Sequence, residues 1–147
     1  MLKLIDPVLG PDLLYILRAM GHGDEIAIVD ANFPAETMGR QVVRLDGIAA
    51  THAAEAILAL LPLDEFEPEA AFVMQQVHAP DELAEICREF EAQVDRASDG
   101  RFGVKSIERF AFYERAKGAF AIVQTGERRL YGNLILKKGV ITPPSQD

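Results

Sequence analysis

A series of short, continuously apolar runs most constrains what this chain can fold into. Residues 26–29 are apolar without alternation, which is typical of a strand buried on both faces of a parallel sheet. Further strand-like runs lie at 42–45, 72–77, 104–107, 119–125 and 130–136. Because helical-period segments separate most of these runs, the sequence predicts a three-layer α/β/α sandwich with a mostly parallel mixed sheet.

The helices are predicted from spacing and from residues that favour helix ends. Apolar residues recur at helical spacing in segments 11–20, 51–61, 80–99 and 109–117. We expect Gly21 to form a left-handed cap and Thr51 to be an N-cap. The last two strand-like runs flank 126–129, a pattern that predicts a C-terminal antiparallel hairpin.

Size and composition fit one domain over residues 1–147. The chain is 49% apolar and 26% charged, values close to those of ordinary globular proteins. It has no apolar run of membrane-spanning length and no signal sequence, so we expect a cytoplasmic protein. Cys87 is the single cysteine, which excludes an internal disulfide, and its place in an apolar helical stripe indicates a structural thiol.

The net charge of −8 is unevenly spread. Residues 1–99 carry 6 basic and 19 acidic side chains, whereas residues 100–147 carry 9 and 4. The overall sign argues against nucleic acid or an anionic membrane as a partner. The basic residues near the C-terminus are interpreted as solvated, or as meeting acidic residues partly across subunit boundaries: Arg128, Arg129, Lys137 and Lys138.

Polar residues just after a strand are candidates for binding, since open α/β sheets bind ligands at the carboxyl ends of their strands. Here these are Asp30 and Asn32. His22 precedes the same strand between two glycines, and histidine is the side chain whose unperturbed pKa, ~6.5, allows proton exchange near neutrality. The alternative is a solvated loop histidine after a helix.

A second candidate group lies near the C-terminus and contains Arg109, Tyr113 and Tyr131-Gly132-Asn133. Its donors, acceptors and aromatic faces suit a neutral polyhydroxylated ligand. Ordinary strand residues with glycine at a bulge would give the same pattern.

Several common sites lack their motifs. The sequence has neither a GxGxxG nor a Walker loop, and no HExxH or paired cysteines. His22, Asp24 and Asp30 are the only metal ligands that the pattern offers, and we expect neither a metal nor a cofactor.

Blocks in order along nearly the whole chain resemble the fucose mutarotase and ribose pyranase family. They are Met1-Leu2-Lys3, Met20-Gly21-His22-Gly23-Asp24-Glu25-Ile26, Asp30-Ala31-Asn32-Phe33-Pro34-Ala35, Arg109-Phe110-Ala111-Phe112-Tyr113-Glu114-Arg115-Ala116, Phe120-Ala121-Ile122-Val123, Thr125-Gly126-Glu127-Arg128, Tyr131-Gly132-Asn133 and Leu136-Lys137-Lys138-Gly139-Val140. Segment 65–101 departs most from the pattern.

The resemblance implies a cofactor-free isomerase that interconverts anomers, or pyranose and furanose forms, of a free monosaccharide. It implies His22 as proton donor, with the sugar held by Asp30, Arg109, Tyr131, Gly132 and Asn133. Arg109 is the fucose-type choice, which favours L-fucose. Ring-shaped homo-oligomers, commonly decamers, with sites at subunit boundaries are also implied.

Ring opening of a sugar needs one acid and one base. We expect Asp30 to orient the sugar or to hold His22 in one tautomer, and Tyr113 or Tyr131 to relay the second proton. A non-catalytic sugar-binding module of an uptake or catabolic pathway is the alternative.

Overall fold

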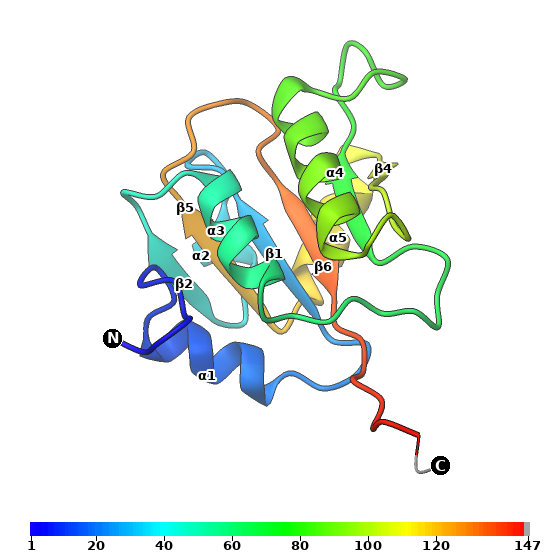
Figure 1. Cartoon of the computed structure of the whole chain (residues 1–147). Helices are drawn as coiled ribbons and strands as arrows, with labels where there is room; N and C mark the ends of the chain where they lie inside the picture. The colour runs from blue at the N-terminus through cyan, green and yellow to red at the C-terminus, as the bar shows by residue number, and fades with distance from the viewer. Residues whose placement is uncertain (146–147) are drawn as a thin grey trace.

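A computed structural model describes residues 1–145 as one six-stranded sheet with helices on both faces (Figure 1). In chain order the elements are α1 (Pro11–Ala19), β1 (Glu25–Val29), α2 (Ala35–Met38), β2 (Val42–Leu45), α3 (Ala50–Leu58), β3 (Ala71–Met74), α4 (Glu85–Ala97), β4 (Lys105–Ile107), α5 (Arg109–Lys117), β5 (Ala121–Thr125) and β6 (Leu134–Lys137). The strand order is β2-β5-β1-β6-β3-β4.

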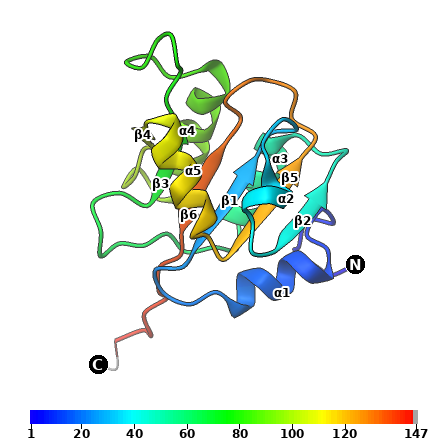
Figure 2. The ribbon, with the colours of Figure 1, turned by 180° about the vertical axis from the view of Figure 1, so that it is seen from behind.

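The sheet separates two hydrophobic layers. Ile26 and Ile28 of β1 pack into the cluster that contains the apolar residues of α1, α3 and α4. Ala27 and Val29 point the other way, into the cluster with α2 and α5. Figure 1 shows α3 and α4 in front of the sheet with α1 along its lower edge, and in the reverse view of Figure 2 α2 and α5 lie in front. This alternation explains the continuous apolar run, because both faces of β1 are buried.

The predicted α/β sandwich is therefore confirmed, and so is its antiparallel C-terminal part. β6 runs antiparallel to β1 and β3, whereas β1–β5, β2–β5 and β3–β4 are parallel. The predicted hairpin between the last two strands is absent, since β1 lies between β5 and β6. Ile26 pairs with Ala121 on one side and Leu136 on the other. The central position of β1 buries it more completely than a hairpin at the sheet edge would allow.

Several predicted boundaries differ from the structure; for example, β6 begins at Leu134 and not at 130, and α3 ends at Leu58 and not at 61. α4 begins at Glu85, after residues 80–84, and β3 ends at Met74. The N-cap of α3 is Ala49, without a side-chain cap, so Thr51 lies inside the helix.

Gly21 does not adopt the expected left-handed conformation; Gly23 does, with φ 85°. Lys138 explains why α1 needs no glycine cap. Its Nζ donates to the backbone carbonyls of Leu17 and Met20, both at 2.6 Å, and so satisfies acceptors at the helix end.

The uneven charge is balanced in part within one chain. Basic residues after position 100 form ion pairs with acidic residues before position 90: Arg101–Glu65, Lys105–Glu69, Arg115–Glu25, Arg129–Glu89 and Lys137–Glu67. Arg129 and Lys137 are therefore paired rather than merely solvated. Within residues 1–145, none of the helices is both long enough and apolar enough to cross a membrane.

Candidate active site

The loop that carries His22 is held by hydrogen bonds to its own residues and to the end of β6. The Gly21 N–H donates to Asp24 Oδ2 at 2.7 Å. The Gly23 N–H donates to the Lys138 carbonyl, and the Lys138 N–H donates to the Asp24 carbonyl, both at 2.8 Å. Gly23 at φ 85° makes this turn without the steric cost of a Cβ. These backbone hydrogen bonds therefore fix the position of the His22 Cα and the point from which its side chain extends.

Asp64 holds the imidazole of His22 in one orientation. Its Oδ1 lies 2.9 Å from His22 Nε2 and accepts from the Phe66 N–H at 3.1 Å. Burial opposes ionisation of Asp64, but the hydrogen bonds from His22 and Phe66 leave its pKa below the ordinary value. An ionised carboxylate can accept a hydrogen bond but cannot donate one, so Nε2 of His22 carries a hydrogen and Nδ1 is the nitrogen left free.

The environment of this pair is open and of mixed polarity. The His22 side chain is 44% exposed while that of Asp64 is 2% exposed. The ring of Phe66 lies 5.2 Å from that of His22. Phe66 and Ile141 line a hollow of about 440 Å³ at this end of the sheet. A ligand can therefore reach the imidazole but not the carboxylate behind it.

Asp30 lies at the opposite end of β1 and is 5% exposed. Its backbone N–H donates to Asn133 Oδ1, and its carboxylate accepts from the Asn32 N–H, both at 2.9 Å. Its carbonyl accepts from Gln124 Nε2 at 2.5 Å. Burial raises the pKa of Asp30, although hydrogen bonds from Asn32 and Asn133 oppose the shift. The carboxyl is thus fixed and less readily ionised than usual.

Residues 131–133 lie beside Asp30 in a constrained conformation. Tyr131 has φ 64°, a left-handed value that costs energy for a residue with a side chain. A Cβ on Gly132 would lie 2.8 Å from Glu127 Cγ and 3.3 Å from Asp30 Cβ. The Asn133 N–H closes the turn onto the Tyr131 carbonyl at 2.7 Å. Only glycine lets this loop approach Asp30 so closely.

Arg109 and Tyr113, from the first and second turns of α5, line a hollow together with Asp30 and residues of the Tyr131 loop. It has a volume of about 210 Å³ and is lined by Asp30, Asn32, Phe33, Met74, Val77, Arg109, Tyr113, Leu130, Tyr131 and Asn133. Arg109 Nε is buried and lacks a hydrogen-bond partner among residues 1–145. The Tyr113 ring packs edge-on against Phe33, at 5.5 Å. An unpaired buried donor is costly unless a ligand satisfies it, so this guanidinium is suited to receive a polar ligand.

The structure thus brings together every predicted site residue except His22. β1 has five residues, and a strand rises about 3.3 Å per residue, so its two ends lie on the order of 15 Å apart. Within one chain Asp30 therefore does not reach His22, so the second of the two roles expected for it, holding His22 in one tautomer, falls to Asp64. The sequence reasoning missed Asp64 and Phe66, which lie more than 40 positions from His22, Asp64 just before segment 65–101 and Phe66 at its start.

The same separation bears on the metal alternative. His22 and Asp24 lie at one end of β1 and Asp30 at the other, so these three side chains do not converge. Within 1–145, histidine, cysteine and acidic side chains nowhere form a group of three or more with the geometry to hold a metal ion.

Comparison with known proteins identifies the relatives of this chain. Residues 3–141 match the sequence profile of the RbsD / FucU transport protein family. The chain belongs to this family. Its RbsD / FucU match covers both the His22 loop and the loop with Tyr131, so both ends of β1 lie inside the shared region.

Individual relatives match over nearly the full chain. The fucose mutarotase of Danio rerio is 49% identical over 99% of this chain and 97% of its own, and that of Homo sapiens is 47% identical over 95% and 94%. The crystal structure of the fucose mutarotase from Streptococcus pneumoniae in complex with L-fucose superposes with a TM-score of 0.88. It is 39% identical and covers 96% of this chain and 100% of its own. The RbsD / FucU fold is therefore shared in full.

Proposed function

We propose that this chain is a monosaccharide mutarotase that interconverts the α and β anomers of free L-fucose without a cofactor. The His22–Asp64 pair carries this proposal. A half-exposed imidazole held by a buried carboxylate is the arrangement used for acid–base chemistry. A module that only binds sugar needs no such pair. Relatives that carry the name fucose mutarotase, at 47–49% identity over nearly the whole chain, support the same reaction.

Mutarotation moves two protons around one breaking bond. The anomeric hydroxyl loses its proton to a base while an acid protonates the ring oxygen. The bond from the anomeric carbon to the ring oxygen breaks, its electron pair stays on that oxygen, and a carbonyl forms at the anomeric carbon. Rotation of the carbonyl and the reverse transfers close the ring on its other face. No atom is gained or lost, so acid–base groups are sufficient.

In this proposal His22 is the proton donor. Asp64 accepts the hydrogen bond from Nε2–H, so the imidazolium form of His22 donates its Nδ1 proton to the sugar and regains a proton at Nδ1 when the ring closes. The negative charge of Asp64 stabilises the imidazolium that forms after each proton is taken up. Typical acid–base assistance of about 100- to 10,000-fold suits a reaction that already proceeds in water.

The other group of residues binds and orients the sugar. Asp30 and Asn133 present oxygen and amide groups to hydroxyls, Arg109 offers its unpaired buried Nε–H, and Gly132 allows close approach. Tyr113 is the proposed second acid–base group. The Tyr131 hydroxyl accepts from the Val77 N–H at 3.0 Å, which orients it and leaves its own proton free to donate.

The two groups of residues belong to one site only if two copies of the chain meet. His22 and Asp30 lie at opposite ends of β1, and the hollow at Asp30 is smaller than the roughly 300–1,000 Å³ of typical ligand pockets. Exposed apolar side chains flank both ends: Phe66 and Ile141 near His22, and Val77 and Leu130 near Asp30. Association of the ends would cover these side chains.

We therefore propose a homo-oligomer in which His22 of one copy faces Asp30 of the next, with a ring-based decamer as the assembly. The proposed compartment is the cytoplasm, where reducing conditions keep a free thiol such as that of Cys87 in its reduced form.

Exchange NMR between the anomers of L-fucose tests the proposed reaction. The wild-type chain should raise the exchange rate above that in buffer, and His22→Ala should return it to that background. His52→Ala is the matched control, because His52 is also half-exposed and lies 2.9 Å from a carboxylate, that of Asp6. Calorimetric binding of L-fucose without faster exchange would refute catalysis and leave a binding module.

A further inference from the structure

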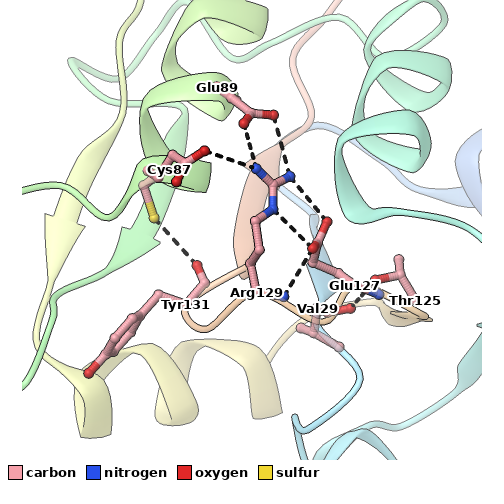
Figure 3. Close-up of polar contacts among 8 residues, drawn as sticks. Val29, Cys87, Glu89, Thr125, Glu127, Arg129 and Tyr131 are labelled. Carbon is pink, nitrogen blue, oxygen red and sulfur yellow. Dashed lines mark hydrogen bonds and ion pairs between the residues drawn. The ribbon is translucent and has the colours of Figure 1, made fainter.

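A buried acid and an arginine of the loop between β5 and β6 form a network with α4 (Figure 3). Glu127 is 6% exposed. Its Oε1 accepts from the N–H and the Nε–H of Arg129, both at 3.1 Å, and its Oε2 accepts from Nη2 at 3.4 Å. The other side of the guanidinium donates to both carboxylate oxygens of Glu89 on α4, at 2.5 and 3.4 Å. Arg129 thus joins the loop to a helix 40 residues earlier.

Charge strengthens this link. Burial raises the pKa of Glu127, but the hydrogen bonds from Arg129 outweigh it, so the pKa lies below the ordinary value. Glu89 and Glu127 together raise the pKa of Arg129 further above its already high value. Glu127 and Arg129 therefore both keep their charges at physiological pH. Arg129 is not the solvated loop residue that the sequence indicates.

The network is in direct contact with the proposed sugar-binding residues. A Cβ at Gly132 would lie 2.8 Å from Glu127 Cγ and 3.1 Å from Ile86 Cδ1 on α4. The carbonyl of Glu127 accepts from the N–H of Ala31, next to Asp30, at 2.9 Å. Figure 3 shows the Tyr131 ring pointing away from the network while its carbonyl faces Cys87.

A second contact connects α4 to the same loop. The Sγ of Cys87 donates to the Tyr131 carbonyl at 3.4 Å. The segment before the loop is anchored as well, because the Thr125 hydroxyl donates to the Val29 carbonyl at 2.7 Å and accepts from the Glu127 N–H at 3.2 Å. β1, β5 and α4 therefore all fix the loop, with the Arg129 side chain as its one charged link to α4.

We propose that Glu127, Arg129 and Glu89 are positioning residues that hold Tyr131, Gly132 and Asn133 at the correct distance from Asp30. This inference rests on the proposed function. The residues do not touch the sugar: they act through the loop. Tyr131 needs such support, because its left-handed backbone is unfavourable and persists only where the surroundings impose it.

Arginine is specifically suited to this task. Its planar guanidinium donates to two carboxylates at once, whereas a lysine ammonium is a point charge that cannot form both forks. Arg129→Lys should therefore rescue only part of the effect of Arg129→Gln. For Arg129→Gln we expect kcat/KM for L-fucose to fall by up to about 100-fold, mainly through a higher KM, because misplacement of a group by about 1 Å can cost that much.

The experiment compares Arg129→Gln with Arg128→Gln, which removes the same charge from the exposed neighbouring residue. Exchange NMR gives KM and kcat for L-fucose, and amide hydrogen exchange without sugar follows the Ala31 and Asn133 N–H groups. Arg129→Gln should raise KM and speed exchange at these amides, with Arg128→Gln like wild type. Glu89→Gln, at a half-exposed position, should give a smaller effect of the same kind and guards against misfolding of the first variant.

A double-mutant cycle separates positioning from general destabilisation. If Arg129 acts through Asn133, Arg129→Gln should change the sugar Kd far less in an Asn133→Ala background than in wild type. Additive effects, or unchanged KM and amide exchange in Arg129→Gln, would overturn the inference. A wild-type chain that neither binds nor converts L-fucose would refute the proposed function instead, while the amide exchange would still report whether Arg129 orders the loop.

Discussion

Replacement of Asp64 by asparagine tests the acid–base role of the pair with His22 while preserving its shape. Asp64 is 1% exposed. Its Oδ1 lies 2.9 Å from His22 Nε2 and 3.1 Å from the N–H donor of Phe66. The oxygen of an asparagine can accept from the same two donors. The variant therefore keeps the imidazole in place and loses the negative charge behind it.

The size of the effect follows from the difference between two kinds of hydrogen bond. A bond to a charged group contributes about 1.5–3 kcal/mol and a neutral one about 0.5–1.5 kcal/mol. The difference of about 1–1.5 kcal/mol matters when the imidazole of His22 carries the proton. Because 1.4 kcal/mol is a factor of ten, kcat should fall roughly 10-fold. KM should change little, since the buried Asp64 does not face the sugar.

Anomer-exchange NMR at several L-fucose concentrations measures both constants. Asp6→Asn is the matched control, because Asp6 makes the same 2.9 Å contact with His52 at an exposed site. That variant should exchange L-fucose like wild type. An unchanged kcat in Asp64→Asn, or a loss that appears only in KM, would refute the role assigned to the pair.

Two further variants test the half of the site around Asp30. Burial raises the pKa of Asp30 above 3.8, so its ionised form costs stability that is absent below about pH 3.8 and fully present above the folded pKa. Asp30→Asn should therefore be more stable to urea than wild type at pH 7, lose this advantage near pH 3 and bind L-fucose more weakly; lower stability at pH 7 would contradict the burial argument. Gly132→Ala places a Cβ 2.8 Å from Glu127 Cγ. Such overpacking should lower the free energy of unfolding by about 1–3 kcal/mol and weaken sugar binding. Wild-type values in both the unfolding and the binding assay would show that the loop relaxes freely.

Local signals were sufficient to predict several elements of this fold. The apolar run at 26–29 became β1, and the segment 109–117 became α5 with the same bounds. In α5 the carboxylate of Glu108 accepts from the N–H groups of Phe110 and Ala111, which fixes the first turn. Such features depend on residues that are close together in the sequence, so they can be predicted from a single sequence.

Strand neighbours depend on the whole sheet and were not predictable in the same way. β5 and β6 are consecutive along the chain, yet each pairs with β1, because the central position buries Ile26 and Ile28 completely. α2 has four residues, too few to show a helical period. Its existence follows from packing of Ala35 into the layer with α5.

The site residues also fall into those that local sequence marks and those that only the fold reveals. Residues that follow a strand, such as Asp30, or that stand in a loop with glycine, such as His22 and Asn133, can be singled out from sequence. Asp64 cannot, because nothing near it marks an acid that reaches a histidine 42 residues earlier. Arg129 likewise looks solvated until its two carboxylate partners are seen in the structure.

The two buried carboxyls near opposite ends of β1 have pKa values shifted in opposite directions. Hydrogen bonds from His22 and Phe66 outweigh the burial of Asp64, so its pKa is lowered and it remains a charged partner for an imidazolium. Burial dominates at Asp30 and raises its pKa, so that carboxyl is closer to holding a proton. The opposite pKa shifts fit the separate roles proposed for the two groups: Asp64 stabilises a charged imidazole, and Asp30 holds the sugar. If two copies of the chain bring these ends together, each site receives one carboxyl of each kind.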